Sequence, residues 1–316
     1  VTTLATALSD QVAALEANMG KVIFGKPEVI RYCVVALLSG EHILLEDVPG
    51  VGKTLAGKAI AKSIAGKFAR LQFTPDLLPS DITGSNVFNS TESRFVFHQG
   101  PVFNNIVLAD EINRAPPRTQ AALLEAMGDH QCSIDGKTYD LPRPFLVVAT
   151  QNPFEYEGTY VLPESQLDRF LLRVSMGYPD LDFERDVLKS HRDGEPVDQL
   201  TPVLSTDDVI QLQQQVRQVK VEASLSDYML DVVHRTRECP DLSVGVSTRG
   251  ALLWYRAAQS YAFASGRDYV VPDDIKRLAI PVLSHRVLAR GLVQGSQREV
   301  VEGIIDRLVS EAPVPS

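Results

Sequence analysis

The sequence predicts an α/β domain with a parallel sheet, followed by a smaller domain built from helices. Up to about residue 178, short apolar runs typical of buried strands alternate with amphipathic helical segments. Beyond residue 180 the strand-like runs nearly cease, and helical patterns follow one another to residue 310. Prolines and glycines interrupt the periodicity between residues 178 and 200. We therefore divide the chain into an α/β domain, residues 1–180, and a helical domain, residues 181–316.

Composition and charge narrow the class of protein. The 316 residues are 44% hydrophobic and carry a formal charge of −9, which argues against a protein that tracks a nucleic-acid backbone across its whole surface. Cys33, Cys132 and Cys239 lie far apart and form no metal or redox motif, so we expect buried thiols. No apolar run approaches the ~18 residues of a membrane span, and the start lacks a signal-peptide pattern. We expect a cytoplasmic protein.

Two helices and a turn precede the first strand. An amphipathic helix is predicted over residues 3–18, and a more apolar helix begins at Pro27. Between them lie Val22, Ile23 and Gly25. An adenine ring would lie well against such apolar side chains and backbone, although the same residues also suit an ordinary core.

The loop at residues 46–54 is the most informative stretch. A short apolar strand, residues 43–45, leads into a glycine-bearing loop that ends in Gly52-Lys53-Thr54, and a helix follows over residues 53–65. In this context backbone N–H groups face an anion, the lysine reaches the β- and γ-phosphates, and the hydroxyl coordinates Mg²⁺. Asp47 stands where the strict motif requires glycine, and Gly-Lys-Thr alone also begins ordinary helices.

Polar side chains end two further apolar strands. Asp110 and Glu111 close the run at residues 105–111. Because adjacent strand side chains alternate, Asp110 can hold Mg²⁺ directly or through water while Glu111 acts as general base for an attacking water. Asn152 follows the run at residues 145–149, where it would lie within reach of a γ-phosphate. Taken alone, the carboxylates would suit a helix cap and the asparagine a turn.

The remaining segments complete the two domains. Residues 74–100 form a long irregular stretch with room for a small hairpin, and stretches of this length are usually functional. Asp135-Gly136 between β-prone residues predicts a second hairpin. The other expected elements are strands at 68–73 and 171–174 and helices at 116–127, 163–170, 183–190, 207–219, 226–237, 249–264 and 272–289.

In this order the features resemble the AAA+ ATPases. That resemblance implies a P-loop NTPase core, in which helices enclose a parallel sheet, and a C-terminal all-α lid. Within this group four segments closely resemble the MoxR family, and the match covers nearly the whole chain. They are Leu-Leu-Glu-Asp-Val-Pro-Gly-Val-Gly-Lys-Thr at 44–54, Ala-Asp-Glu-Ile-Asn-Arg-Ala-Pro at 109–116, Ala-Thr-Gln-Asn-Pro at 149–153 and Leu-Pro-Glu-Ser-Gln-Leu-Asp-Arg-Phe at 162–170. Asp47 is itself a MoxR-like feature.

The resemblance also implies roles by position. Arg169 matches the arginine finger that enters a neighbouring subunit's site, with Arg173 as a second candidate, and Arg249 matches sensor 2 of the lid. Thr248 departs from the proline that relatives often have there. Residues 84–103 resemble the helix-2 insertion and residues 131–140 the pre-sensor-1 hairpin. The implied catalytic residues are Glu111, Lys53, Asn152, Arg169 and Arg249, the metal ligands are Thr54 and Asp110, and the nucleotide contacts are Val22, Ile23, Gly25, Asp47, Pro49, Gly50, Val51, Gly52, Lys53, Thr54 and Leu55.

The resemblance implies an ATPase that uses ATP and Mg²⁺ in a ring, which we expect to be a hexamer. The MoxR family is associated with chaperone-like maturation of protein complexes and metal-cofactor insertion into protein clients, often with von Willebrand factor A-domain partner proteins. Two alternatives stay open. A DNA-directed motor resembling the MCM helicases would use Lys137 near the hairpin tip, although one lysine in an acidic chain speaks against nucleic acid. A scaffold that binds ATP without hydrolysing it would not need Glu111 or Arg169.

Overall fold

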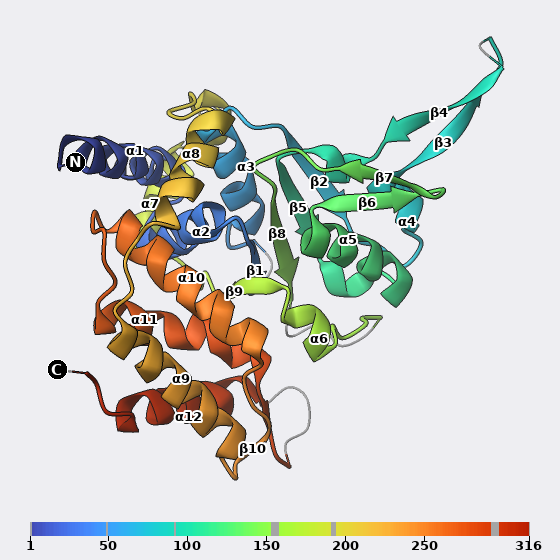
Figure 1. Cartoon of the computed structure of the whole chain (residues 1–316). Coiled ribbons are helices and arrows are strands. Elements are labelled where there is room, and N and C mark those ends of the chain that lie inside the picture. Colours follow the sequence, from blue (N-terminus) through green and yellow to red (C-terminus); the bar gives the residue numbers. More distant parts are fainter. Residues whose placement is uncertain are drawn as a thin grey trace.

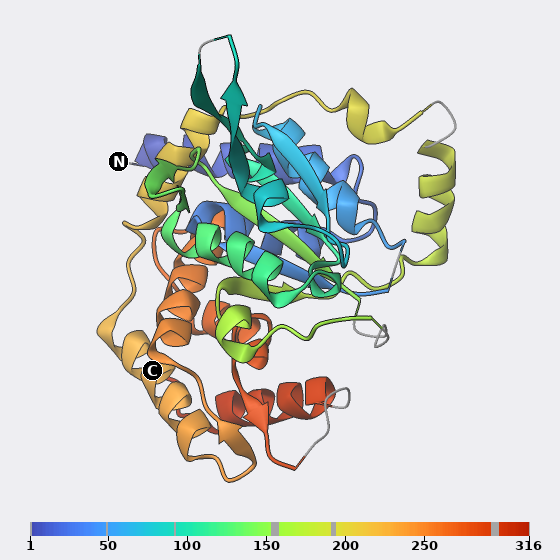
Figure 2. The same cartoon turned by 90° about the vertical axis from the view of Figure 1, so that its right-hand side faces the viewer.

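The computed structural model describes residues 2–48, 50–91, 93–152, 158–190, 194–291 and 297–315. Figures 1 and 2 show a sheet between two layers of helices, with further helices packed at one end. This arrangement confirms the predicted fold class, a parallel α/β domain followed by a C-terminal group of helices.

Five parallel strands form the sheet in the order β2-β5-β8-β1-β9. They are β1 (His42–Glu46), β2 (Phe68–Gln72), β5 (Ile106–Asp110), β8 (Leu146–Gln151) and β9 (Phe170–Val174). Every residue of β1 and β5 is buried, as expected for parallel strands covered on both faces. Because β1 lies between β8 and β9, the loop that follows β1 leaves the sheet in its interior and not at an edge strand.

The strand register decides which side chains meet at each edge. Gln72 pairs with Asp110 at the carboxyl ends of β2 and β5, whereas His42 pairs with Phe170 at the amino ends of β1 and β9. A five-residue strand spans about 16 Å. Residues that precede β1 and β9 therefore lie a full strand length away from the loops that follow these strands.

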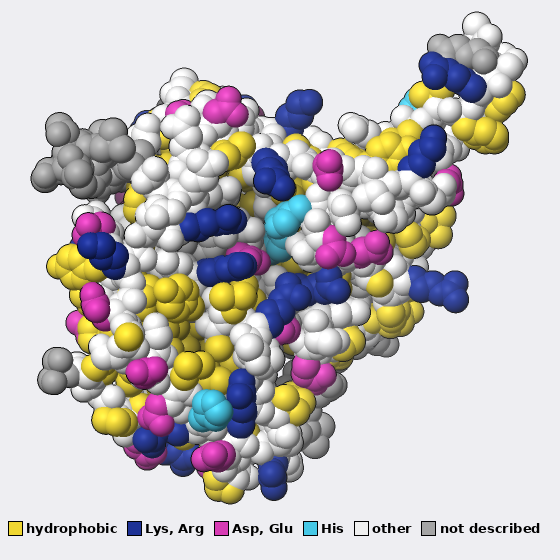
Figure 3. All heavy atoms as spheres, viewed as in Figure 1, with side chains coloured by type: hydrophobic (Ala, Val, Ile, Leu, Met, Phe, Trp, Pro, Cys, Tyr) yellow, Lys and Arg dark blue, Asp and Glu magenta, His cyan; other side chains and the backbone are white. Residues whose placement is uncertain are grey.

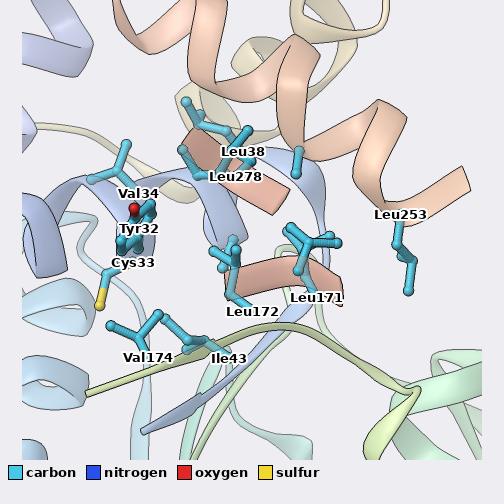
Figure 4. Close-up of a cluster of buried hydrophobic side chains, with 14 of the residues drawn as sticks. Tyr32, Cys33, Val34, Leu38, Ile43, Leu171, Leu172, Val174, Leu253 and Leu278 are labelled. Carbon is cyan, nitrogen blue, oxygen red and sulfur yellow. The ribbon is translucent and has the colours of Figure 1, made fainter. Parts of the chain in front are cut away.

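Side chains of the sheet alternate between two hydrophobic cores. Ile43 and Leu45 belong to one core and Leu44 to the other, because successive strand residues point to opposite faces. The first core extends from α1, α2 and α3 into the C-terminal helices, and Figure 4 shows the part that α2, β1, β9 and those helices share. The second core lies under α4 and α5. These helices are α1 (Thr2–Gly20), α2 (Pro27–Ser39), α3 (Lys53–Ser63), α4 (Pro79–Thr83) and α5 (Pro117–Asp129).

Two hairpins extend from the α/β domain. The first projects well away from the body, and hydrophobic side chains are visible along it (Figures 1 and 3). The second turns at Asp135 and Gly136 with φ of 49° and 77°, as the Asp-Gly signal predicts. The ring of Phe97 stacks on Tyr139 with centroids 4.4 Å apart, so the hairpins pack together at the base of the first. The hairpins are β3 (Gly84–Asn89) with β4 (Arg94–Gln99), and β6 (Gln131–Ile134) with β7 (Lys137–Asp140).

The segment between the two predicted domains stays with the α/β side. The short helix α6 (Glu164–Leu167) precedes β9. After β9 come α7 (Leu181–Ser190) and a 3₁₀ turn at Pro196–Gln199. Figure 2 shows α7, in yellow-green, beside the α/β domain and away from the orange and red C-terminal helices. The division between residues 180 and 181 therefore stays a proposal. The helix that follows it, α7, lies beside the α/β domain.

The predicted helix over residues 272–289 is wrong beyond Leu283. There the chain forms a 3₁₀ turn, Ser284–Arg286, and then pairs with an earlier strand. Arg286 is buried in this turn, where its guanidinium donates to the carbonyl of Phe170 and pairs with Asp168 at 2.9 Å. This long-range contact ends the helix. The C-terminal elements are α8 (Thr206–Val216), α9 (Ala223–Glu238), β10 (Leu242–Val244), α10 (Thr248–Ala264), α11 (Pro272–Leu283), β11 (Leu288–Ala289) and α12 (Gln297–Glu311).

The three cysteines are buried free thiols, as predicted. Burial raises the pKa of Cys33 to about 12, which makes this thiol unreactive at neutral pH. In the part of the chain that the structure describes, no helix is both long and apolar enough to cross a membrane.

Trp254→Ala should lower the free energy of unfolding by about 3–5 kcal/mol. Trp254 is the largest fully buried side chain, and its indole N–H donates to the carbonyl of Ile275 at 3.1 Å. Urea denaturation followed by circular dichroism would measure the change. Leu252→Ala, at an exposed position on the same helix, is the control and should change stability by less than about 0.5 kcal/mol. Equal losses in the two variants would contradict this account of the core.

Candidate active site

A cavity of about 500 Å³ opens at the carboxyl edge of the sheet. Its volume is in the range of small-molecule sites. It brings together Lys53 and Thr54 at the start of α3, Asp110 and Glu111 at the end of β5, and Asn152 after β8. These residues come from three separate strand ends, so the shared edge of the parallel sheet unites them.

The loop between β1 and α3 suits close approach by an anion. Gly50 and Gly52 have φ of 86° and 94°, in the region that favours glycine. Gly52 also caps α3 without a side chain that would satisfy the first N–H groups of the helix, and an anion can bind there instead. Val51 and Leu55 line the cavity together with the two glycines. Pro49, another predicted nucleotide contact, lies outside the described residues.

Backbone carbonyls hold the Lys53 side chain at the cavity. Its Nζ donates to the carbonyl oxygen of Asp47 at 2.6 Å and to that of Gln151 at 3.3 Å. Burial lowers the pKa of Lys53 from its ordinary 10.5, and nearby carboxylates, Asp47 foremost, partly offset this effect. A phosphate would give this partly desolvated ammonium a fully charged partner.

Asp47 does not line the cavity, although it was predicted to contact nucleotide. Its carboxylate accepts hydrogen bonds from the backbone N–H of Gly177, the hydroxyl of Ser175 and the backbone N–H of Val48. Burial alone would raise the pKa of Asp47, but these hydrogen bonds outweigh it and hold the pKa below 3.8. Asp47 thus fastens the loop to the segment after β9, and its carboxylate is occupied by these donors.

Asp110 and Glu111 are each held by neighbouring side chains. The hydroxyl of Thr150 donates to Asp110 Oδ1 at 2.6 Å and accepts the backbone N–H of Glu111 at 2.9 Å. Glu111 has φ of 56°, which is uncommon outside glycine and takes the backbone out of the strand conformation directly after β5. Its carboxylate accepts from Gln72 Nε2 at 3.0 Å and pairs with Arg114 at 3.1 Å. One threonine therefore positions both acids.

Arg70 and Gln72 are the residues of this network that lie outside the sequence motifs. The guanidinium of Arg70 pairs with Asp110 at 2.6 Å, and Arg70 lines the cavity. Strand alternation in residues 68–72 puts Arg70 and Gln72 on one face of β2, which is the signal that would have found them.

The other side of the cavity is largely apolar. Val22 and Ile23 line it as predicted, and α7 contributes Val187. Gly25 does not line the cavity, because the ring of Phe183 lies against it. The unpredicted lining residues have no shared motif, since folding collects them from separate segments. They are Phe24, Lys26, Lys58, Arg70, Met176, Pro179, Val187, Glu195 and Val197.

Arg169 and Arg249 lie away from this cavity. Arg169 immediately precedes β9 at the amino edge of the sheet, where its guanidinium donates to the carbonyl of Leu124 on α5. Arg249 is exposed at the start of α10, one heptad before Arg256, which pairs with Glu41 next to the amino end of β1. Both arginines are thus on the edge opposite the phosphate loop.

Arg173, the second candidate for the finger, is buried inside the chain. Its Nη1 lies 3.7 Å from Glu46 Oε2, and its Nη2 donates to the hydroxyl of Ser284 at 3.2 Å. Burial lowers the pKa of Arg173, and the charge of Glu46 partly offsets this. A side chain held between β1 and the C-terminal helices cannot enter a neighbouring subunit, so Arg173 is excluded as a finger.

The donor set suits a magnesium ion that arrives with phosphates. Among the described residues no cluster of three or more His, Cys, Asp or Glu side chains could hold a metal ion. Asp110 offers one carboxylate at the cavity, and Thr54 offers a hydroxyl. Mg²⁺ is commonly bound through one or two carboxylates together with substrate phosphates, so these residues fit it.

Comparisons with known proteins identify the family. Residues 42–172 match the ATPase family associated with various cellular activities (AAA), and residues 234–304 match the AAA lid domain. The chain is 42% identical to the chaperone MoxR1 of Mycobacterium tuberculosis over 90% of this chain and 78% of that protein. This chain belongs to the MoxR family of AAA ATPases.

Two further relatives of this MoxR-family chain cover nearly all of it. The uncharacterized protein YeaC of Bacillus subtilis is 47% identical over 94% of this chain and 93% of its own. A crystal structure from Cytophaga hutchinsonii, 36% identical, has a TM-score of 0.89 and covers 99% of this chain and 97% of that one. AAA ATPases bind nucleotide and are typically oligomeric, which gives the cavity its expected ligand class.

Asp47→Asn should lower the free energy of unfolding at pH 7 by about 1–3 kcal/mol, because the amide cannot accept the same charge-assisted hydrogen bonds. The folded-state pKa of Asp47 is depressed, so its contribution is present above pH 3.8 and is lost as the pH falls through the folded pKa. The difference between wild type and variant should therefore shrink only in strong acid. Urea denaturation at several pH values would measure it.

Asp182→Asn is the matched control for this prediction. Its side chain is 88% exposed on α7, so its substitution should leave stability nearly unchanged at every pH. Equal stability of wild type and Asp47→Asn at pH 7 would contradict the proposed fastening of the loop.

Proposed function

We propose that this MoxR-family chain hydrolyses ATP with Mg²⁺ in a ring of six subunits, as its family resemblance implies, to drive chaperone-like remodelling of protein clients. The observation that carries the proposal is the meeting of Lys53, Asp110 and Glu111 at one cavity. AAA membership implies ATP hydrolysis. The task supported most directly is chaperone-like, since MoxR1 is named a chaperone.

The nucleotide roles follow from the position of each group. Lys53 and the N–H groups at the start of α3 would hold the phosphates, and Thr54 with Asp110 would hold Mg²⁺. When bound, Mg²⁺ supplies charge neutralisation at the phosphates. Val22 and Ile23 line the apolar side, where they would contact the base.

Glu111 is the group we assign as general base. Its backbone N–H is held by Thr150 and its carboxylate by Gln72, so it is oriented before a water is activated. Asn152 lines the same cavity and would orient that water or the γ-phosphate. Phosphoryl transfer to water depends mainly on such positioning and on electrostatic stabilisation.

A ring explains why two of the predicted catalytic arginines are remote from the cavity. Arg169 and Arg249 lie at the amino edge of the sheet, about a strand length of 16 Å from the carboxyl edge. We propose that both serve the cavity of an adjacent subunit. Association of such subunits with a von Willebrand factor A-domain protein, and metal-cofactor insertion as the particular task, rest on the family resemblance.

Glu111→Gln should lower ATP turnover at least about 100-fold, because the amide cannot take a proton from water. ATP binding should be kept or tightened, since the substitution removes a negative charge near the phosphates. Phosphate release and equilibrium binding of a fluorescent ATP analogue would measure the two effects. Glu164→Gln, at an exposed position on α6, is the control and should retain turnover. Full turnover in Glu111→Gln would exclude it as the base.

Arg169→Ala should lower ATP turnover about 10³-fold or more, the effect expected for an arginine finger. Mixing it with Lys53→Ala protein should restore turnover, because some interfaces then combine an intact phosphate loop with an intact arginine. A mixture of Arg169→Ala and Arg249→Ala should stay inactive, since neither subunit supplies both arginines. Phosphate release by the mixtures would measure this. Turnover unaffected by Arg169→Ala would exclude Arg169 as the finger, and no recovery in the mixture with Lys53→Ala protein would contradict a shared site.

A further inference from the structure

Arg70 occupies the carboxylate that the proposed function assigns to the metal ion. Its Nη2 donates to Asp110 Oδ2 at 2.6 Å and its Nε to the same oxygen at 3.2 Å. The other oxygen of Asp110 accepts the hydroxyl of Thr150 at 2.6 Å. Both oxygens of Asp110 therefore have donors in this structure.

A magnesium ion and this guanidinium cannot both use Asp110 Oδ2. Mg²⁺ binds carboxylate oxygen at about 2.0–2.1 Å and requires near-octahedral geometry, which leaves no room for two N–H donors on one oxygen. Two cations at this separation also repel each other. Direct coordination of a metal ion by Asp110 Oδ2, which is the case we consider, thus requires Arg70 to move.

The structure favours movement of Arg70 over movement of Asp110. The Arg70 side chain is 51% exposed and borders the cavity, whereas that of Asp110 is 12% exposed and tied to Thr150. Half-exposed ion pairs contribute little to stability, so the guanidinium can leave at small cost. By contrast, Arg286 also pairs with an aspartate, Asp168, but its side chain is only 1% exposed, as in a permanent structural pair.

We propose that Arg70 is a displaceable counter-ion of Asp110. Its guanidinium neutralises the carboxylate until a Mg·nucleotide binds, and then moves away. The inference rests on the proposed function, because it needs a metal ion at Asp110. It assigns a task to a residue outside the recognised motifs. Arg70 is a positioning residue, and it sets the magnesium concentration at which the nucleotide complex forms.

The test is a magnesium titration of nucleotide binding to the full chain. A ribose-labelled fluorescent ATP analogue is held at fixed concentration while Mg²⁺ is raised at constant ionic strength. In Arg70→Gln the half-saturating Mg²⁺ concentration should fall about three- to tenfold, because the competing cation is gone. Arg70→Lys keeps the charge and should stay within about twofold of wild type.

Arg307→Gln is the matched control. Arg307 also pairs with an aspartate at 2.6 Å, and its side chain is 49% exposed, but it lies in α12 outside the lining of the cavity. Its magnesium curve should coincide with that of wild type. Circular dichroism and thermal unfolding would establish that Arg70→Gln is folded, as expected for a half-exposed side chain.

The outcomes separate this inference from the proposed function. If wild type binds the analogue and Arg70→Gln has an unchanged or higher half-saturating Mg²⁺ concentration, Arg70 does not compete with the metal and the inference is wrong. If wild type binds no analogue with or without Mg²⁺, the proposed function fails and the inference fails with it. A lower half-saturating concentration in Arg70→Gln alone supports the inference.

Discussion

The parallel register of the central sheet is the constraint on which the rest of this molecule depends. Because β1, β5 and β8 run in the same direction and lie next to one another, their carboxyl ends open at a single edge. Lys53, Asp110 and Asn152 reach one cavity for that reason alone. A slip of one residue in β1 would move Leu44 into the core that now holds Ile43 and Leu45, and would move those two residues into the other core. Hydrophobic burial therefore enforces the register that the site requires.

The two acids at the end of β5 each have defined hydrogen-bond donors. Asp110 is held by Thr150 and Arg70, and Glu111 by Gln72 and Arg114. Asp47, which could have repelled a phosphate, instead accepts hydrogen bonds from the segment after β9. The Lys53 ammonium donates to two neutral carbonyl oxygens, and a charged phosphate would be a stronger acceptor. The groups around the phosphate loop are thus held in place before a polyanion binds, and such preorganisation is a main source of electrostatic stabilisation in enzymes.

The same sheet separates two sets of residues to which we assign functions. The phosphate loop is at the carboxyl edge, whereas Arg169 and Arg249 are at the amino edge. An arginine at that edge cannot serve its own cavity without crossing the length of a strand. In a family that is typically oligomeric, this separation is the geometry expected of a site completed by a neighbouring subunit. Arg173 shows the contrast, because its ion pair with Glu46 connects β1 and β9 inside one chain.

The sequence by itself determined the fold class, the approximate positions of most elements and the cavity residues that belong to motifs, such as Lys53 and Glu111. These depend on local patterns, since hydrophobic periodicity and a strand–loop–helix motif are written in neighbouring residues. Only the tertiary structure decided that Arg70 pairs with Asp110, that Asp47 binds the segment after β9 and that the helix after Pro272 ends at Leu283. Each of these results from contacts between segments distant in the chain, which local periodicity does not encode.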